Sequence, residues 1–176
     1  MELFQGQVVA HPHHGPARVT GFTERKIKGE VMRYARLEVK GTGMVVGIPV
    51  DRAEEIGVRA LLDGEETNRL FAILVDESGP EEKGWSRRIK AEIQLLRSGD
   101  MFKIAGMVRD LTRRQEERGL SLAEKDLLRD ASQPLVNEVA LCLEVTPEEA
   151  QKIVDAAIIE RDLPETVVVE QVAKAV

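Results

Sequence analysis

The chain has 176 residues, of which 43% are hydrophobic and 32% charged, and this composition is that of a globular protein rather than a disordered tail. One cysteine, Cys142, excludes an intramolecular disulfide and an all-cysteine metal site. No apolar run approaches the roughly 18 residues needed to span a bilayer, and the formal net charge of −6 argues mildly against a nucleic-acid partner.

The first 50 residues have the pattern of short β-strands. Runs rich in β-branched residues predict strands at 7–10, 17–27, 31–40 and 44–50, with glycine- and proline-containing turns between them. Lys28 and Gly29 join the two longest runs, so we expect a tight hairpin in which Gly29 takes a positive φ. Several antiparallel strands within so short a stretch predict a small Tudor- or SH3-like β-barrel.

After about residue 60 the hydrophobic period changes to about 3.6 residues, which predicts helices. Capping boxes at 63–66, 121–124 and 146–149 predict three helix starts, and Asp100 is expected to cap another. Pro134 falls inside a predicted helix and removes one of its hydrogen bonds, so we expect a kink or a break near 129–133. The predicted fold class is α+β: a barrel at 1–58, an all-helical domain at 59–160 and a tail of uncertain structure at 161–176.

Motifs of catalysis and of metal binding are missing from the sequence. The glycines at 41, 43 and 47 resemble a dinucleotide-binding loop, but the third is misplaced by one position and the segment opens a strand. His11, His13 and His14 lie close together, yet a strand-to-turn segment without nearby carboxylates or cysteines is more typical of a turn than of a metal site. We therefore expect no enzyme activity, no cofactor and no metal.

The stretch 83–118 contains ten basic residues against five acidic ones, and it includes the only tryptophan, Trp85. Trp85 stands at a predicted helix start and is followed by Arg87, Arg88 and Lys90. An apolar wedge with bases on the flanking phosphates is used by proteins that enter the DNA minor groove. From the residues alone, however, a ring packed between helices and a solvated basic helix face are the simpler interpretations.

Several strings, taken together and in order, resemble the CarD/CdnL family, whose N-terminal module also occurs in transcription-repair coupling factors. The strings begin with Val-Val-Ala-His-Pro-His-His-Gly and include Trp-Ser-Arg-Arg-Ile-Lys. The resemblance covers roughly residues 1–145 of both halves. The strings occupy 8–15, 48–59, 85–90, 98–100, 108–114, 117–121 and 124–125.

The resemblance implies a transcription regulator with a Tudor-like domain that docks on the β subunit of RNA polymerase. It also implies a helical domain at the upstream edge of the transcription bubble, where a tryptophan wedge in the minor groove near the −10 element stabilises the open complex. In this sequence the polymerase contact would be Arg25, with Ile27 beside it on the same strand face. The DNA-binding residues would be Trp85, Arg87, Arg88, Lys90 and Lys125.

Two departures from the family pattern stand in the first half. Gly47 replaces a second arginine of the polymerase contact, which would weaken or shift docking, and Ala10 replaces an aromatic residue. We expect a monomer that is cytoplasmic and reaches the nucleoid through RNA polymerase. The alternative is an interaction adaptor without DNA contacts. A buried Trp85, together with a scatter of Arg87, Lys90, Arg109 and Arg113 over different faces, would favour it.

Overall fold

The computed structural model describes residues 2–27, 29–80, 84–165 and 167, except the side chain of Ile27. A four-stranded antiparallel sheet comes first, with its strands in sequential order. The strands are β1 (Val8–His11), β2 (Gly15–Ile27), β3 (Glu30–Val39) and β4 (Val45–Pro49). The helices that follow are the 3₁₀ turn η1 (Val50–Arg52), α1 (Ala53–Ile56), α2 (Gly64–Val75), α3 (Trp85–Ser98), α4 (Met101–Arg118), α5 (Leu122–Cys142) and α6 (Pro147–Ile159).

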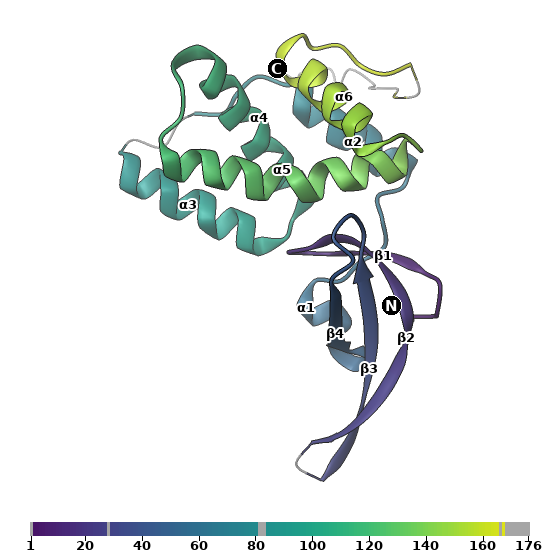
Figure 1. Cartoon of the computed structure of the whole chain (residues 1–176). Helices are drawn as coiled ribbons and strands as arrows, with labels where there is room; N and C mark the ends of the chain where they lie inside the picture. Colours follow the sequence, from purple (N-terminus) through teal and green to yellow (C-terminus); the bar gives the residue numbers. More distant parts are fainter. Residues whose placement is uncertain (1, 28, 81–83, 166, 168–176) are drawn as a thin grey trace, which may run out of the picture.

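The predicted α+β class is confirmed, with one refinement of the barrel (Figure 1). The sheet is a curled half-barrel, because β1 and β4 form its two edges. The edge strand β1 gains one further partner through paired backbone hydrogen bonds between Ala10 and Arg59, of 2.8 and 3.1 Å. The concave side of the sheet is filled by alternate buried side chains, among them Val9, Val19 and Leu37.

The hairpin between β2 and β3 is the longest extension of the sheet. Gly29 has φ +92°, as expected for the tight turn, whereas Lys28 lies outside the described residues. Pairing runs from Ile27 opposite Glu30 to Ala17 opposite Val39, with one bulge near Gly21. Figure 1 shows that this hairpin projects away from the helices.

All three predicted capping boxes are present, at Asp63, Ser121 and Thr146. In each, the N-cap side chain accepts from the backbone three residues later, and the glutamate there accepts from the N-cap backbone. Asp100 caps α4, accepting from the N–H groups of Phe102 and Lys103. These local signals fix where the helices begin.

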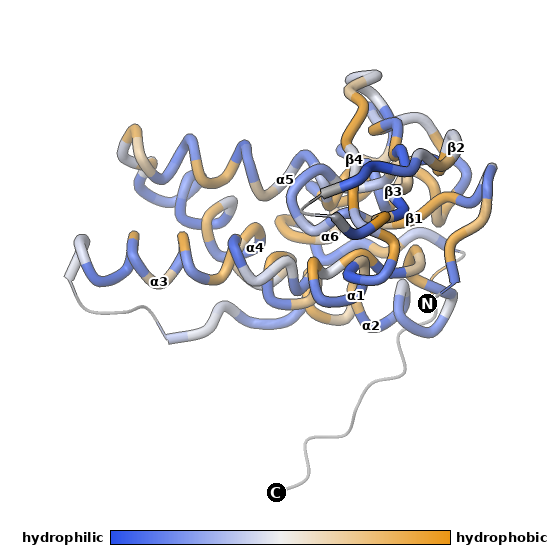
Figure 2. Tube along the Cα trace, turned by 90° about the horizontal axis from the view of Figure 1, so that it is seen from below, coloured by the Kyte–Doolittle hydropathy of each residue, from blue (hydrophilic) through white to orange (hydrophobic). Residues whose placement is uncertain are grey.

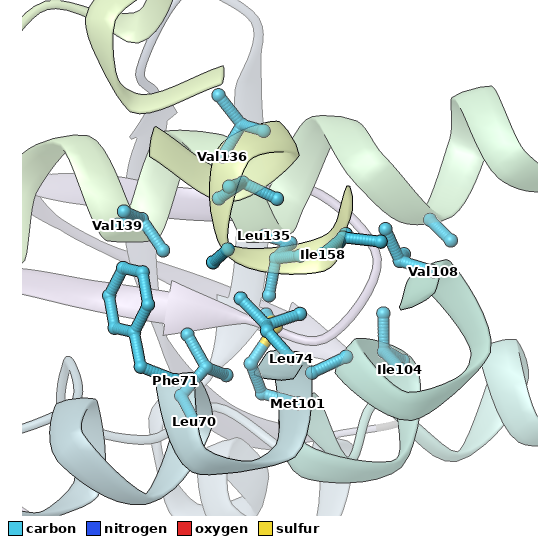
Figure 3. Packing of buried hydrophobic residues seen from close by; sticks show 14 of the residues in the cluster. Leu70, Phe71, Leu74, Met101, Ile104, Val108, Leu135, Val136, Val139 and Ile158 are labelled. Atoms are coloured by element: carbon cyan, nitrogen blue, oxygen red, sulfur yellow. The ribbon is translucent and has the colours of Figure 1, made fainter. Parts of the chain in front are cut away.

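The helices bury one shared hydrophobic core. Figure 3 shows side chains of α2, α4, α5 and α6 converging, with Phe71, Ile104, Leu135 and Ile158 among them. Helix α3 contributes only partly buried residues such as Ile93, so it lies at the margin of this core. Hydrophilic and hydrophobic stretches accordingly alternate along α3 (Figure 2).

The helix does not break near 129–133, because α5 is one continuous helix from Leu122 to Cys142. Pro134 is buried, and a Cβ atom on Gly15 would lie 3.2 Å from its Cα atom. The proline therefore packs against the first residue of β2. This burial of an apolar ring offsets the lost hydrogen bond within the helix.

A buried ion pair also joins the half-barrel to α5. Glu138 is fully buried and accepts from both terminal nitrogens of Arg59, at 2.7 and 2.9 Å, and from the backbone N–H of Leu62 at 3.0 Å. Two parallel hydrogen bonds to one carboxylate fix orientation as well as distance. The sheet is thereby held in one position against the helices.

Little of the predicted tail is described. Val167 is buried, and its N–H donates to the carbonyl of Pro164 at 2.9 Å, whereas 166 and 168–176 lie outside the described residues. Among the helices that the structure describes, none combines the length and the apolar character of a membrane span.

Candidate nucleic-acid interface

Trp85 is the first residue of α3, and its side chain is not part of the core. The residue is 54% exposed, and its indole Nε1 donates to Oγ of Ser121 at 3.3 Å. The packed ring, favoured from the residues alone, is therefore wrong. Gly84 precedes it at the N-cap position with φ +99° and offers no capping side chain to the first N–H groups of the helix.

Ser121 links this tryptophan to a buried carboxylate. Its hydroxyl donates to Oε2 of Glu124 at 2.6 Å, so its oxygen is left as an acceptor for the indole N–H, which can only donate. Glu124 is almost fully buried. Burial raises the pKa of Glu124, but the hydrogen bonds from Ser121 and Arg88 outweigh it and hold that pKa at about 2.

The other oxygen of Glu124 binds two arginines of different helices. Arg88 of α3 reaches it at 3.0 Å and Arg114 of α4 at 3.1 Å. Glu92 stands next to Arg114, 3.5 Å away, and burial raises the pKa of Glu92. This ion cluster ties the starts of α3 and α5 to the side of α4.

Arg88 thus lies inward, and its side chain is only 16% exposed. The other three bases that the family resemblance assigns to DNA are exposed: Arg87 and Lys90 on the first turns of α3, and Lys125 on the first turn of α5. Figure 1 shows α3 and α5 beginning at the same end of the helical region. Trp85 and these three bases therefore come from two neighbouring helix starts.

Two further arginines of the basic stretch are structural. Arg109 is buried and donates to the carbonyl of Ile73 at 2.9 Å, and Arg113 donates to the carbonyl of Ile158 at 2.9 Å. These carbonyls belong to the last turns of α2 and α6, where helix carbonyls lack partners within their own helix. The guanidinium groups of both arginines therefore connect α4 to the ends of two other helices.

The half-barrel presents the residues of the expected polymerase contact on and beside the hairpin. Arg25 is exposed on β2, and its guanidinium carbon lies 5.5 Å from the centroid of the Tyr34 ring. The backbone of Ile27 pairs with Glu30, while its side chain lies outside the described region. Gly47 is exposed on β4 opposite Arg36, and nothing lies within 4 Å of the place its Cβ atom would take.

The histidine cluster is a turn whose central ring is buried. Nδ1 of His11 accepts from the N–H of His13 at 3.2 Å. Burial, and then the neighbouring His14 and His13, lower the pKa of His11 to about 4, so the ring is neutral at pH 7. Within the described residues, no group of three or more histidine, cysteine or acidic side chains could hold a metal ion.

The environment of Cys142 does not activate its thiol. Burial raises the pKa of Cys142, and its Sγ lies 3.4 Å from the carbonyl oxygen of Leu62. A thiolate is therefore disfavoured at this position.

Two family models match consecutive segments of the chain. The first, CarD-like/TRCF RID domain, matches residues 3–61, and the second, CarD, C-terminal domain, matches residues 69–155. The chain is also similar to a protein of Bacillus subtilis (strain 168) described as "Putative transcription factor YdeB". The two are 24% identical over 148 residues, which are 84% of this chain and 97% of that protein.

Proposed function

The chain belongs to the CarD family, and from this premise we propose that it bridges the β subunit of RNA polymerase and promoter DNA and stabilises the open complex. The family is one of transcription regulators rather than enzymes, and it implies contact with polymerase and DNA in general. The division of labour would follow the two hydrophobic cores: the half-barrel docks on polymerase, and the helical region meets DNA.

The observation that carries the DNA side of the proposal is the exposed indole of Trp85 at the start of α3. An exposed aromatic ring can enter the minor groove and unstack neighbouring base pairs, and Arg87 and Lys90 would then reach the flanking phosphates. The uncapped N–H groups after Gly84 suit a phosphate as well. Arg88 would support this surface from within, through its ion pair with Glu124.

The mechanism would rest on differential binding. Docking on polymerase raises the local concentration of a weak DNA binder. A wedge favours distorted DNA at the edge of the bubble over paired duplex, so it stabilises the open complex more than the closed one. Each ~1.4 kcal/mol of that preference changes the ratio of open to closed complexes about tenfold.

Bridging also needs a fixed geometry between the two contacts. The hairpin with Arg25 and the start of α3 lie at distant ends of the molecule (Figure 1). The bidentate pair of Arg59 with Glu138 and the packing of Gly15 on Pro134 hold the half-barrel and the helices together between them. A rigid connection lets polymerase docking position the wedge at one register of the promoter.

The alternative is an adaptor that contacts no DNA. Arg109 and Arg113 donate to carbonyls at the ends of α2 and α6, which removes two bases from any DNA surface and favours this interpretation. The exposed Trp85 beside the exposed Arg87 and Lys90 argues against it, because an apolar ring flanked by cations matches a DNA groove lined by phosphates. The DNA-binding proposal is therefore preferred.

The test uses the cognate polymerase holoenzyme and a promoter whose open complex is short-lived. The protein should lengthen the half-life of the open complex, and Trp85→Ala should abolish most of this effect while still binding polymerase. Lys152→Ala, which removes an exposed base from α6, is the matched control and should behave as the wild type. An undiminished effect of Trp85→Ala would favour the adaptor.

A further inference from the structure

Leu122 is the first residue of α5 and is 77% exposed, more than any other large hydrophobic side chain that the structure describes. The side chain of Leu122 contributes little to the fold, because the capping box that begins α5 is formed by Ser121 and Glu124. An isolated exposed leucine needs no explanation by itself. Its position beside Ser121, the hydrogen-bond partner of Trp85, distinguishes this one.

We propose that Leu122 is a second apolar side chain of the DNA-inserting surface, entering the minor groove beside Trp85. The proposal rests on the proposed function and deepens it. Ser121 receives the indole N–H at 3.3 Å, and Leu122 is the next residue along the chain. The start of α5 is therefore held against the start of α3, and each helix start presents one exposed apolar side chain.

The two helix starts share a layout of an apolar residue followed by a base. On α5, Lys125 comes three residues after Leu122, and residues at this spacing lie on one face of a helix. On α3, Arg87 and Lys90 follow Trp85. These two bases and Lys125 are all exposed. Apolar side chains bordered by cations match DNA, in which the apolar faces of the stacked bases are flanked by phosphates.

Leucine is among the side chains that proteins insert between base steps. A single ring contacts one step, whereas two apolar side chains from adjacent helices can occupy a wider opening of the groove. We therefore expect Leu122 to add to the preference for the partly melted fork over paired duplex. Its contribution would be smaller than that of Trp85, because its apolar surface is smaller.

The experiment compares two substitutions of similar size in the full chain. Leu122→Gln makes the side chain polar, and Leu122→Met keeps it apolar; Trp85→Ala is run beside them. Binding is measured by the fluorescence anisotropy of a labelled promoter fork, with the fully paired duplex as the second probe. Ile159→Gln, which makes an exposed residue of α6 polar, is the matched control.

Leu122→Gln should weaken fork binding roughly threefold to tenfold, as expected for apolar area kept in water. Leu122→Met and Ile159→Gln should bind as the wild type, and the Tm of all three should stay unchanged. Weakening of fork and duplex to the same extent, or a lower Tm for every Leu122 variant, would overturn the insertion.

The result also separates this inference from the proposed function. If Leu122→Gln binds the fork as the wild type does while Trp85→Ala is weakened, Leu122 is not an inserting residue and the proposed function stands. If both variants bind as the wild type, both proposals fail.

Discussion

The indole Nε1 of Trp85 and Oγ of Ser121 are 3.3 Å apart, and this hydrogen bond joins the first residue of α3 to the residue that caps α5. The hydroxyl of Ser121 donates its one hydrogen bond to Oε2 of Glu124 at 2.6 Å. The lone pairs of its oxygen are therefore left to accept from the indole N–H. Glu124 in turn binds Arg88 of the same helix as Trp85. The ring is thus exposed and yet held in one orientation by groups that are themselves fixed.

Ser121→Ala should therefore lose both helix capping and the orientation of Trp85. Loss of the cap costs about 1 kcal/mol of stability, and the effect on open-complex lifetime should fall as well. Thr146→Ala is the control, since Thr146 caps α6 with the same capping box far from the tryptophan. Thermal melting and open-complex decay are measured on both variants. Equal losses of lifetime in the two would show that Ser121 acts through stability alone.

Trp85→Ala should leave the free energy of unfolding nearly unchanged, because the ring is 54% exposed and outside the core. The fully buried Phe71 provides the comparison. Phe71→Ala should lose about 3–5 kcal/mol, from lost burial and the cavity left behind. Urea unfolding followed by circular dichroism checks both values. A loss for Trp85→Ala close to that for Phe71→Ala would contradict the exposed position.

The sequence predicted the helix starts because their signals are local. Asp63, Ser121 and Thr146 act within their own first turns, so each capping box could be identified without the rest of the fold. The positive φ of Gly29 could be predicted for the same reason, because the tight turn itself requires it. The family resemblance, by contrast, predicted an exposed Trp85 where its local sequence favoured a packed ring, and the ring is exposed.

The errors concern contacts between segments distant in sequence. A solvated face was the simpler interpretation of the basic stretch 83–118, but Arg109 and Arg113 of this stretch donate to carbonyls in the last turns of α2 and α6. Pro134 looked like a helix breaker, but Gly15 packs on it from 119 residues away. The Ser121 side chain was assigned to capping, and nothing in a capping box signals a tryptophan 36 residues earlier. Such contacts depend on tertiary packing, which periodicity does not encode.

His11 should give the protein a stability that depends on pH. Its pKa is lowered from 6.5 to about 4 in the folded state, so the unfolded chain binds more protons between these values. This contribution is complete above about pH 6.5 and is lost as the pH falls towards 4. His11→Asn keeps an acceptor for the His13 N–H but cannot titrate. The Tm of this variant should vary less between pH 6.5 and 4, and an unchanged slope would contradict the assignment.

Arg25→Glu should weaken association with the polymerase β subunit roughly tenfold or more. The reason is that the proposed attraction between Arg25 and acidic groups of the β subunit becomes a repulsion. The fold should survive, since Arg25 is exposed and its contact with Tyr34 is worth about 0.5–1 kcal/mol. Lys26→Glu is the control, with the same charge change at an exposed position on the other face of β2. Binding of the purified β subunit is measured for both. Equal weakening would show an effect of net charge rather than a contact at Arg25.

Gly47→Arg should strengthen polymerase binding if the missing arginine weakens docking. The backbone allows the change, because the φ of Gly47 is not positive and its Cβ position is open. Arg36 lies directly opposite on β3, and the repulsion between two arginines would cost about 0.2–1 kcal/mol of stability. Replacing a glycine within a strand offsets some of that cost.

The expected gain in affinity is at most about fivefold, since an exposed ion pair contributes ~0.2–1 kcal/mol. Gly47→Gln is the matched control: it fills the same space without charge and should bind as the wild type. Titration calorimetry against the β subunit at two salt concentrations measures the gain, which should shrink as salt rises. A folded Gly47→Arg variant with no gain at low salt would mean that this half-barrel docks through a surface that does not include β4.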